Sequence, residues 1–233
     1  MKFKIFEQFL YNFESEEHIK IEPITTSVTM YHDKYDYNFS PEIIFANISN
    51  SYEIAGNFFE NKNNISVEEY DKNLEEITIP STAESIENFT FFGFNNLISV
   101  NIPDSVISIG ETAFFGCKSL INIFVDEKSN EYSSIDGVLF DKKLQTLIAY
   151  PQNKKNETYV VPNSVKNIRS NAFFDCENII NIILPSSIEN IGEAAFCGCK
   201  NLANIELPDS IINIGSSAFC RCASLKTITL YPS

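Results

Sequence analysis

Cysteines are the side chains of this 233-residue chain with the clearest capacity for chemistry. Four of the six recur at one position of a repeated pattern: Cys117, Cys176, Cys199 and Cys222. Cys197 and Cys220 each add a Cys-x-Cys pair. Residues two apart in a helical turn diverge by about 200°, so such a pair is poorly placed to chelate zinc. We expect buried free thiols, because cysteine packs as a small hydrophobe. Cross-coil disulfides, which export would favour, and a metal site are the alternatives.

Other catalytic constellations are scarce. His18 and His32 are the only histidines, so a Ser-His-Asp or Cys-His arrangement would have to use one of them. Neither G-x-x-x-x-G-K-[ST] nor G-x-G-x-x-G occurs, which leaves no candidate loop for cradling phosphate. We therefore expect no enzyme, no cofactor and no metal. An enzyme whose chemistry lies in residues 1–73 is the alternative.

Charge and hydropathy argue against two classes of partner. The chain has 17 basic and 31 acidic side chains and a formal net charge of −14, whereas a nucleic-acid-binding protein needs a basic face. No apolar run approaches the roughly 20 residues of a membrane-spanning helix. We expect no nucleic-acid binding and no membrane insertion. The amino-terminal stretch lacks a small-residue cleavage site, and we identify no signal peptide there.

The elements that must position these side chains are 23-residue repeats. Units begin at Leu97, Ile179 and Leu202, a degenerate copy begins at Leu74, and a further copy begins at Leu225. The consensus is L-x-x-I-x-[IL]-P-x-S-[VI]-x-x-I-G-x-x-A-F-x-x-C. Self-similarity at such a period is typical of a solenoid, in which each coil buries its face only against its neighbours.

Each unit predicts one coil. The alternation in L-x-x-I-x-I favours a short strand with one buried face, which the proline ends. The segment V-x-x-I returns apolar residues to the interior, and a glycine follows where a tight corner needs a permissive backbone. The run A-F-x-x-C has helical spacing and predicts a short helical turn.

Two sets of side chains should be buried in such a stack of coils. The first is the strand pairs Ile77 with Ile79, Val100 with Ile102, Ile182 with Leu184, and Ile205 with Leu207. The second is an aromatic stack of Phe114, Phe173, Phe196 and Phe219.

Residues 120–178 form an expanded repeat, 36 residues longer than the unit. Asp136-Gly137 is a turn signal between apolar segments, which predicts a hairpin-like insertion. Residues 144–151 then add another rung.

Residues 1–73 do not carry the repeat. A helical pattern of phenylalanines and several β-branched segments predict a mixed α/β amino-terminal capping region, which would cover the exposed edge of the first coil. A separate small interaction domain is the alternative.

The repeat resembles the BspA-like class of leucine-rich repeats over about residues 74–233. The motif I-P-x-S-V-x-x-I-G-x-x-A-F-x-x-C and the insertion S-x-D-G-V-L-F-D…L-I-x-Y-P carry the resemblance. It implies a curved, β-rich repeat solenoid with a parallel sheet and no enzymatic activity. It also implies a role as a surface antigen, adhesin or protein-binding module at the cell surface or outside the cell. Two features depart from that class: no secretion signal is visible, and the last repeat ends after nine residues, as in a truncated product, a fragment or an open end.

The outward strand positions form the candidate binding surface. The third and fifth positions of L-x-x-I-x-I face away from the core, where solubility and hydrogen bonding between coils would also explain them. The candidate partner-binding residues are Asn122, Phe124, Asn181, Ile183, Asn204 and Glu206. We expect Phe124 and Ile183 to contribute to one apolar contact patch. The predicted function is a non-enzymatic module that binds a protein partner; a structural or self-assembling segment of a larger repeat protein is the alternative.

Overall fold

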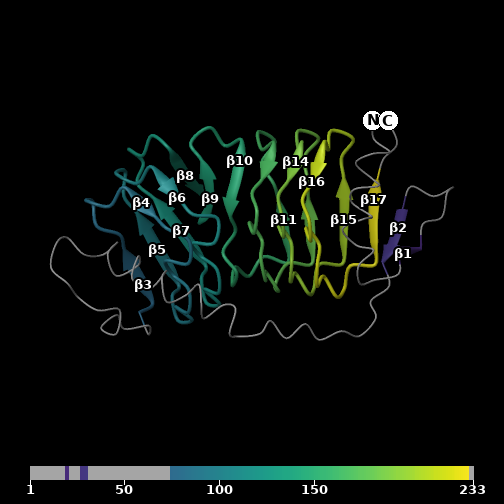
Figure 1. Cartoon of the computed structure of the whole chain (residues 1–233), viewed down its shortest axis with the longest axis horizontal. Coiled ribbons are helices and arrows are strands. Elements are labelled where there is room, and N and C mark those ends of the chain that lie inside the picture. The colour runs from purple at the N-terminus through teal and green to yellow at the C-terminus, as the bar shows by residue number, and fades with distance from the viewer. Residues whose placement is uncertain (1–18, 21–26, 31–73, 231–233) are drawn as a thin grey trace.

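Residues 74–230 form a solenoid whose coils each contribute short strands to two rows. The computed structural model describes residues 19–20, 27–30 and 74–230. The strands follow one another along the stack from β3 (Glu76–Thr78) at one end to β17 (Thr227–Leu230) at the other (Figure 1). The predicted repeat solenoid is confirmed.

The first row consists of the strands from the L-x-x-I-x-[IL] segments. They are β3 (Glu76–Thr78), β5 (Ser99–Ile102), β7 (Asn122–Val125), β11 (Thr158–Val160), β13 (Asn181–Ile183), β15 (Asn204–Leu207) and β17 (Thr227–Leu230). Neighbours within β3–β5–β7 and within β11–β13–β15–β17 pair in parallel. Equivalent residues of successive repeats lie opposite one another, as Ile182 does to Ile205. The predicted inward pairs are confirmed as buried, except that Leu184 is only partly buried against the core.

The second row consists of the V-x-x-I segments and one strand of the insertion. Its strands are β4 (Ser85–Ile86), β6 (Ser108–Ile109), β10 (Thr146–Ala149), β12 (Asn167–Ile168), β14 (Asn190–Ile191) and β16 (Asn213–Ile214). Asparagine amides form a ladder along it: Asn213 donates to Asn190, and Asn190 donates to Asn167, both at 2.8 Å. Each amide thereby satisfies its neighbour in the next coil.

The corners of the coils differ from the sequence prediction. Among the described residues there is no helix, and the A-F-x-x-C segments are successions of hydrogen-bonded turns. In one coil the amide of Ala172 donates to the carbonyl of Arg169 and that of Cys176 to Phe173. Asn171 and Asp175 have φ values of 59° and 53°. Left-handed residues at this spacing interrupt a right-handed helix, so the predicted helical turn is wrong.

The repeated glycines have a different role from the predicted one. Gly192 does not have a positive φ. A Cβ at Gly192 would instead lie 2.7 Å from the carbonyl carbon of Arg169 and would overlap the backbone of Ser170. The consensus glycine is therefore needed because the backbones of neighbouring coils approach closely at this corner.

The insertion contains the predicted hairpin and extra rung. Strands β8 (Tyr132–Ile135) and β9 (Val138–Asp141) pair antiparallel across Asp136-Gly137, and β10 pairs in parallel with β12. Both faces of β9 are buried. Val138 and Phe140 pack into the carboxyl-terminal core, whereas Leu139 packs into the amino-terminal core. The insertion thus separates two hydrophobic cores within one stack.

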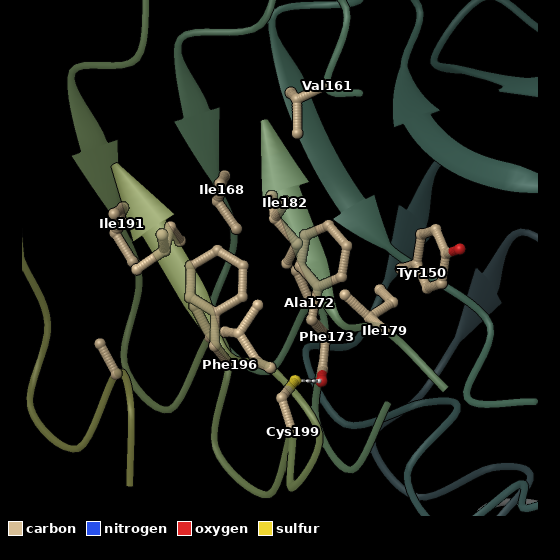
Figure 2. Packing of buried hydrophobic residues seen from close by; sticks show 14 of the residues in the cluster. Tyr150, Val161, Ile168, Ala172, Phe173, Ile179, Ile182, Ile191, Phe196 and Cys199 are labelled. Carbon is tan, nitrogen blue, oxygen red and sulfur yellow. Dashed lines mark hydrogen bonds between the residues drawn. The ribbon is translucent and has the colours of Figure 1, made fainter. Parts of the chain in front are cut away.

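An aromatic column runs through the carboxyl-terminal core (Figure 2). Tyr150, Phe173, Phe196 and Phe219 stack in succession at centroid distances of 5.0, 5.0 and 5.2 Å. The predicted stack is correct for the last three members and wrong for Phe114. That ring is only partly buried and stacks on Phe91 in the other core at 5.4 Å. The insertion supplies Tyr150 in its place.

The described part of the amino-terminal region lies at the end of the stack that β17 forms. Strand β1 (Ile19–Lys20) pairs with β2 (Ser27–Met30), and β2 pairs antiparallel with β17. The predicted mixed α/β cap over the first coil otherwise falls on residues outside the described part of the chain.

Candidate binding face

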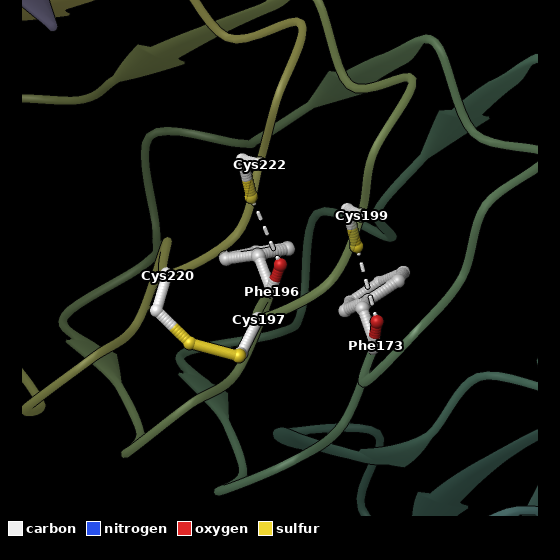
Figure 3. The surroundings of a disulfide bond; sticks show 6 residues. All are labelled: Phe173, Phe196, Cys197, Cys199, Cys220 and Cys222. Carbon is white, nitrogen blue, oxygen red and sulfur yellow. Dashed lines mark hydrogen bonds between the residues drawn. A yellow bond between two sulfur atoms is a disulfide. The ribbon is translucent and has the colours of Figure 1, made fainter. Parts of the chain in front are cut away.

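Four cysteines form a repeated internal contact, as predicted for buried free thiols. Each donates its S–H to the backbone carbonyl of an aromatic residue in the preceding coil. The pairs are Cys117 to Phe91 at 3.2 Å, Cys176 to Tyr150 at 3.6 Å, Cys199 to Phe173 at 3.1 Å and Cys222 to Phe196 at 3.0 Å. Two of these contacts appear in Figure 3. Burial raises the pKa of all four thiols, that of Cys222 to about 12. Because the thiolate is the reactive form, these positions are chemically inert.

This burial predicts a loss of stability at alkaline pH. The pKa of the Cys222 thiol is about 12 in the folded chain, whereas the ordinary pKa of a thiol, which applies to the unfolded chain, is 9.0. Between these values the unfolded state binds fewer protons, so each such thiol should lower the unfolding free energy by about 1.4 kcal/mol per pH unit. Urea titrations from pH 9 to 11 should therefore show a shallower decline for Cys222→Ala than for the parent. Equal slopes would contradict the assignment.

The other two cysteines form a cross-coil disulfide. Cys197 and Cys220 are bonded, with their Cα atoms 4.5 Å apart (Figure 3). The preference for free thiols was wrong at these two positions, and the disulfide alternative is correct. In earlier coils Phe92 and Phe115 occupy the same position, and their rings stack at a centroid distance of 6.0 Å. This position therefore brings side chains of successive coils together outside the aromatic column.

Few described residues offer other chemistry. No group of three or more His, Cys, Asp or Glu side chains in the described ranges is arranged to hold a metal ion. His18 and His32 lie outside these ranges. Nor does the described part of the chain contain a helix long and apolar enough to cross a membrane.

Four of the six candidate partner-binding residues share one sheet. Asn181 and Ile183 lie on β13, and Asn204 and Glu206 lie on β15. Asn181 is opposite Asn204 in the parallel register. The side chain of Ile183 is 54% exposed, and Asn204 and Glu206 are also exposed. The structure thus brings these four side chains onto one outward surface.

The other two candidates lie on a different sheet. Asn122 and Phe124 belong to β7, and no hydrogen bond joins β7 to β11. Beside β7 lies the hairpin turn, where the amide of Ile123 donates to the carbonyl of Gly137 at 2.9 Å. Asn122 is half-buried against this turn, whereas Phe124 is 44% exposed. Phe124 and Ile183 are therefore not carried by one continuous sheet, because the pairing of strands is interrupted between them.

Sequence reasoning missed Val160. It lies on β11 directly opposite Ile183 and is 59% exposed. The signal was present, because Pro162 is in phase with the repeat and places Val160 at the outward fifth position. This repeat lacks the first leucine of the consensus, so its strand and the outward position of Val160 were not identified from the sequence. We name the outward surface of β11, β13 and β15 around Val160 and Ile183 the apolar face.

Comparisons with known proteins agree with this architecture. A family model described as the BspA type leucine-rich repeat region matches six copies, over residues 69–159 and 149–233. A leucine-rich repeat protein from Eubacterium ventriosum is similar at 27% identity and a TM-score of 0.63, over 68% of this chain and 42% of that one. The pneumococcal vaccine antigen PcpA is similar at 26% identity and a TM-score of 0.54, over 68% and 51%.

The two solved structures are longer, so the chain spans only about half of their length or less. No curated protein matches it. The repeat consensus, the two rows of parallel strands and the family match over most of the solenoid agree, and the chain belongs to the BspA-type leucine-rich repeat family.

Proposed function

We propose that the chain is a non-enzymatic module that binds a protein partner through the apolar face. The observation that carries this proposal is the pairing of Val160 and Ile183. These two β-branched side chains lie opposite each other in register, and more than half of each is exposed. Adjacent exposed apolar side chains within a polar surface are typical of a contact site.

The surroundings of this pair suit recognition of a polypeptide. Asn181 and Asn204 offer both hydrogen-bond donors and acceptors on the same surface. Strands β13 and β15 are held by parallel pairing on both sides, and β11 is held by pairing with β13, so little conformational entropy is lost when a partner docks. A small apolar centre with a polar rim is the usual anatomy of a protein interface.

The cross-coil disulfide supports a role at a cell surface. Disulfides persist in oxidising compartments and are rare in reducing ones. Among the similar structures, PcpA is described as a vaccine antigen. We therefore propose an exported protein that meets its partner outside the reducing cytosol.

Self-assembly is the weaker alternative. End-to-end growth of the first row would need a free edge on β17, and that edge pairs with β2 of the same chain. A net charge of −14 also opposes close stacking of copies.

The test uses a double variant and a matched control. Val160→Ser with Ile183→Ser removes the apolar centre. Ile107→Ser with Ile212→Ser removes side chains that are 62% and 50% exposed in the second row. A partner is first isolated with the immobilised full chain, and its affinity for each purified variant is then measured. Loss of two central contacts should weaken binding by tenfold or more, since each is worth about 1 kcal/mol or more.

The control variant should bind like the parent, and both variants should keep the parent's circular dichroism spectrum. Undiminished binding by the Val160, Ile183 variant would contradict the proposal, as would an equal loss in the control.

A further inference from the structure

The negative charge of the solenoid is concentrated at one end. From residue 74 to residue 117 there are six acidic side chains and no lysine or arginine. All six are exposed: Glu75, Glu76, Glu84, Glu87, Asp104 and Glu111. From residue 118 to residue 230 there are 12 acidic and 11 basic side chains, so the rest of the stack is nearly balanced. The first two coils therefore create most of the solenoid's negative field.

An exposed aromatic ring lies on the sheet of this acidic end. The outward surface of β3, β5 and β7 carries Glu76, Thr78, Asn101 and Phe124, and we name it the acidic face. Asn101 lies opposite both Thr78 on β3 and Phe124 on β7. Its amide donates to the Glu76 carboxylate at 2.8 Å and to the Thr78 hydroxyl at 3.3 Å. Asn101 thereby holds a carboxylate on the same surface as the Phe124 ring.

Strand spacing sets the distance between these groups. Adjacent strands lie roughly 4.8 Å apart, so the carboxylate and the ring are separated by about two strand spacings. Side chains two residues apart in an extended peptide point to the same side and lie about 7 Å apart, and the long side chains of lysine and arginine extend that reach. One extended segment crossing the strands can therefore reach both groups at once.

We infer that the acidic face binds a cationic segment in which lysine or arginine alternates with apolar residues. A guanidinium or ammonium group is attracted both to a carboxylate and to the face of an aromatic ring. A second copy of this chain is the wrong occupant, because it would place one acidic end against another.

This inference rests on the proposed function, since it names partner chemistry for another part of the same row of strands. The two regions differ in character. The apolar face carries Val160 and Ile183, and its binding should change little with salt. Binding at the acidic face should weaken as salt rises, because exposed charges are screened within about 10 Å at 0.1 M.

Two ten-residue peptides, one alternating arginine with leucine and the other glutamate with leucine, serve as probes. Fluorescence anisotropy of each labelled peptide is measured with the full chain at 50 mM and 500 mM salt. We expect binding of the arginine peptide only, weakened at least tenfold at the higher salt. Phe124→Ala should weaken it about tenfold. Glu75→Gln with Glu76→Gln should weaken it about fivefold, in line with two exposed ion pairs.

The matched control is Glu193→Gln with Asp209→Asn, which removes the same charge from exposed positions on later coils. It should bind the arginine peptide within twofold of the parent. Equal weakening by both double variants would overturn the inference, because the attraction would then be to net charge alone. Binding of the glutamate peptide, or no binding of the arginine peptide, would overturn it as well.

The same proteins separate this inference from the proposed function. If the arginine peptide fails to bind while the Val160, Ile183 variant binds the isolated partner more weakly than the parent does, only the inference about the acidic face is wrong. If the Val160, Ile183 variant still binds the isolated partner while the arginine peptide binds as described, only the proposal that the apolar face binds the partner is wrong.

Discussion

Replacing Phe196 by alanine should lower the free energy of unfolding by about 3–5 kcal/mol. The ring is fully buried between Phe173 and Phe219, at centroid distances of 5.0 and 5.2 Å. Removing it would leave a cavity in the middle of the column, and neighbouring coils are held too firmly by their strands to close it. Urea titration followed by circular dichroism measures the change. Phe124→Ala is the control, since its exposed ring should contribute less than about 1 kcal/mol. If the Phe196→Ala variant were as stable as the parent, the assignment of this ring to the core would be refuted.

Reduction of the Cys197–Cys220 disulfide should lower the unfolding free energy by about 3 kcal/mol. The bond closes a loop with a sequence separation of 23 residues, and a loop of this size restricts the unfolded chain by about that amount. The measurement is a urea titration of the full chain with and without excess reductant.

The control for this prediction is Cys197→Ala with Cys220→Ala. Its stability should not respond to reductant, because the four remaining cysteines are already thiols. Identical unfolding midpoints of the oxidised and reduced parent would show that the cross-link adds nothing.

The repeat period made the strands predictable. In each coil the same apolar positions face the core, and every coil repeats the constraint on its neighbours, so a wrong phase would expose a whole row of side chains. Val100 and Ile205 are buried for this reason. The corners were not predictable in the same way. Asn171 and Asp175 adopt left-handed conformations, although neither is glycine. A-F-x-x-C spacing alone does not distinguish such turns from a helix.

The candidate face was predictable only in part, because the path of the insertion depends on tertiary contacts. The Lys154 ammonium is largely buried and donates to the carbonyl of Asp136, and the Ile123 amide donates to Gly137. These bonds place the hairpin turn beside β7 and separate Phe124 from Ile183. No periodicity in the sequence contains that information.

The disulfide shows a similar limit. Cys197 and Cys199 are two residues apart, and only the second faces the aromatic column, where it donates to Phe173. The direction of Cys197 follows from the turn geometry at the corner, which the sequence prediction had wrong. Once that geometry is known, a Cα distance of 4.5 Å to Cys220 makes the bond possible.

Hydroxyl-radical footprinting of the full chain with its isolated partner tests the proposed binding surface most directly. Val160 and Ile183 are exposed and should be oxidised in the free protein. When the partner binds, their labelling should fall severalfold, while Ile107 and Ile212 in the second row should be labelled as before. Protection of Ile107 and Ile212 with unchanged labelling of Val160 and Ile183 would contradict the account.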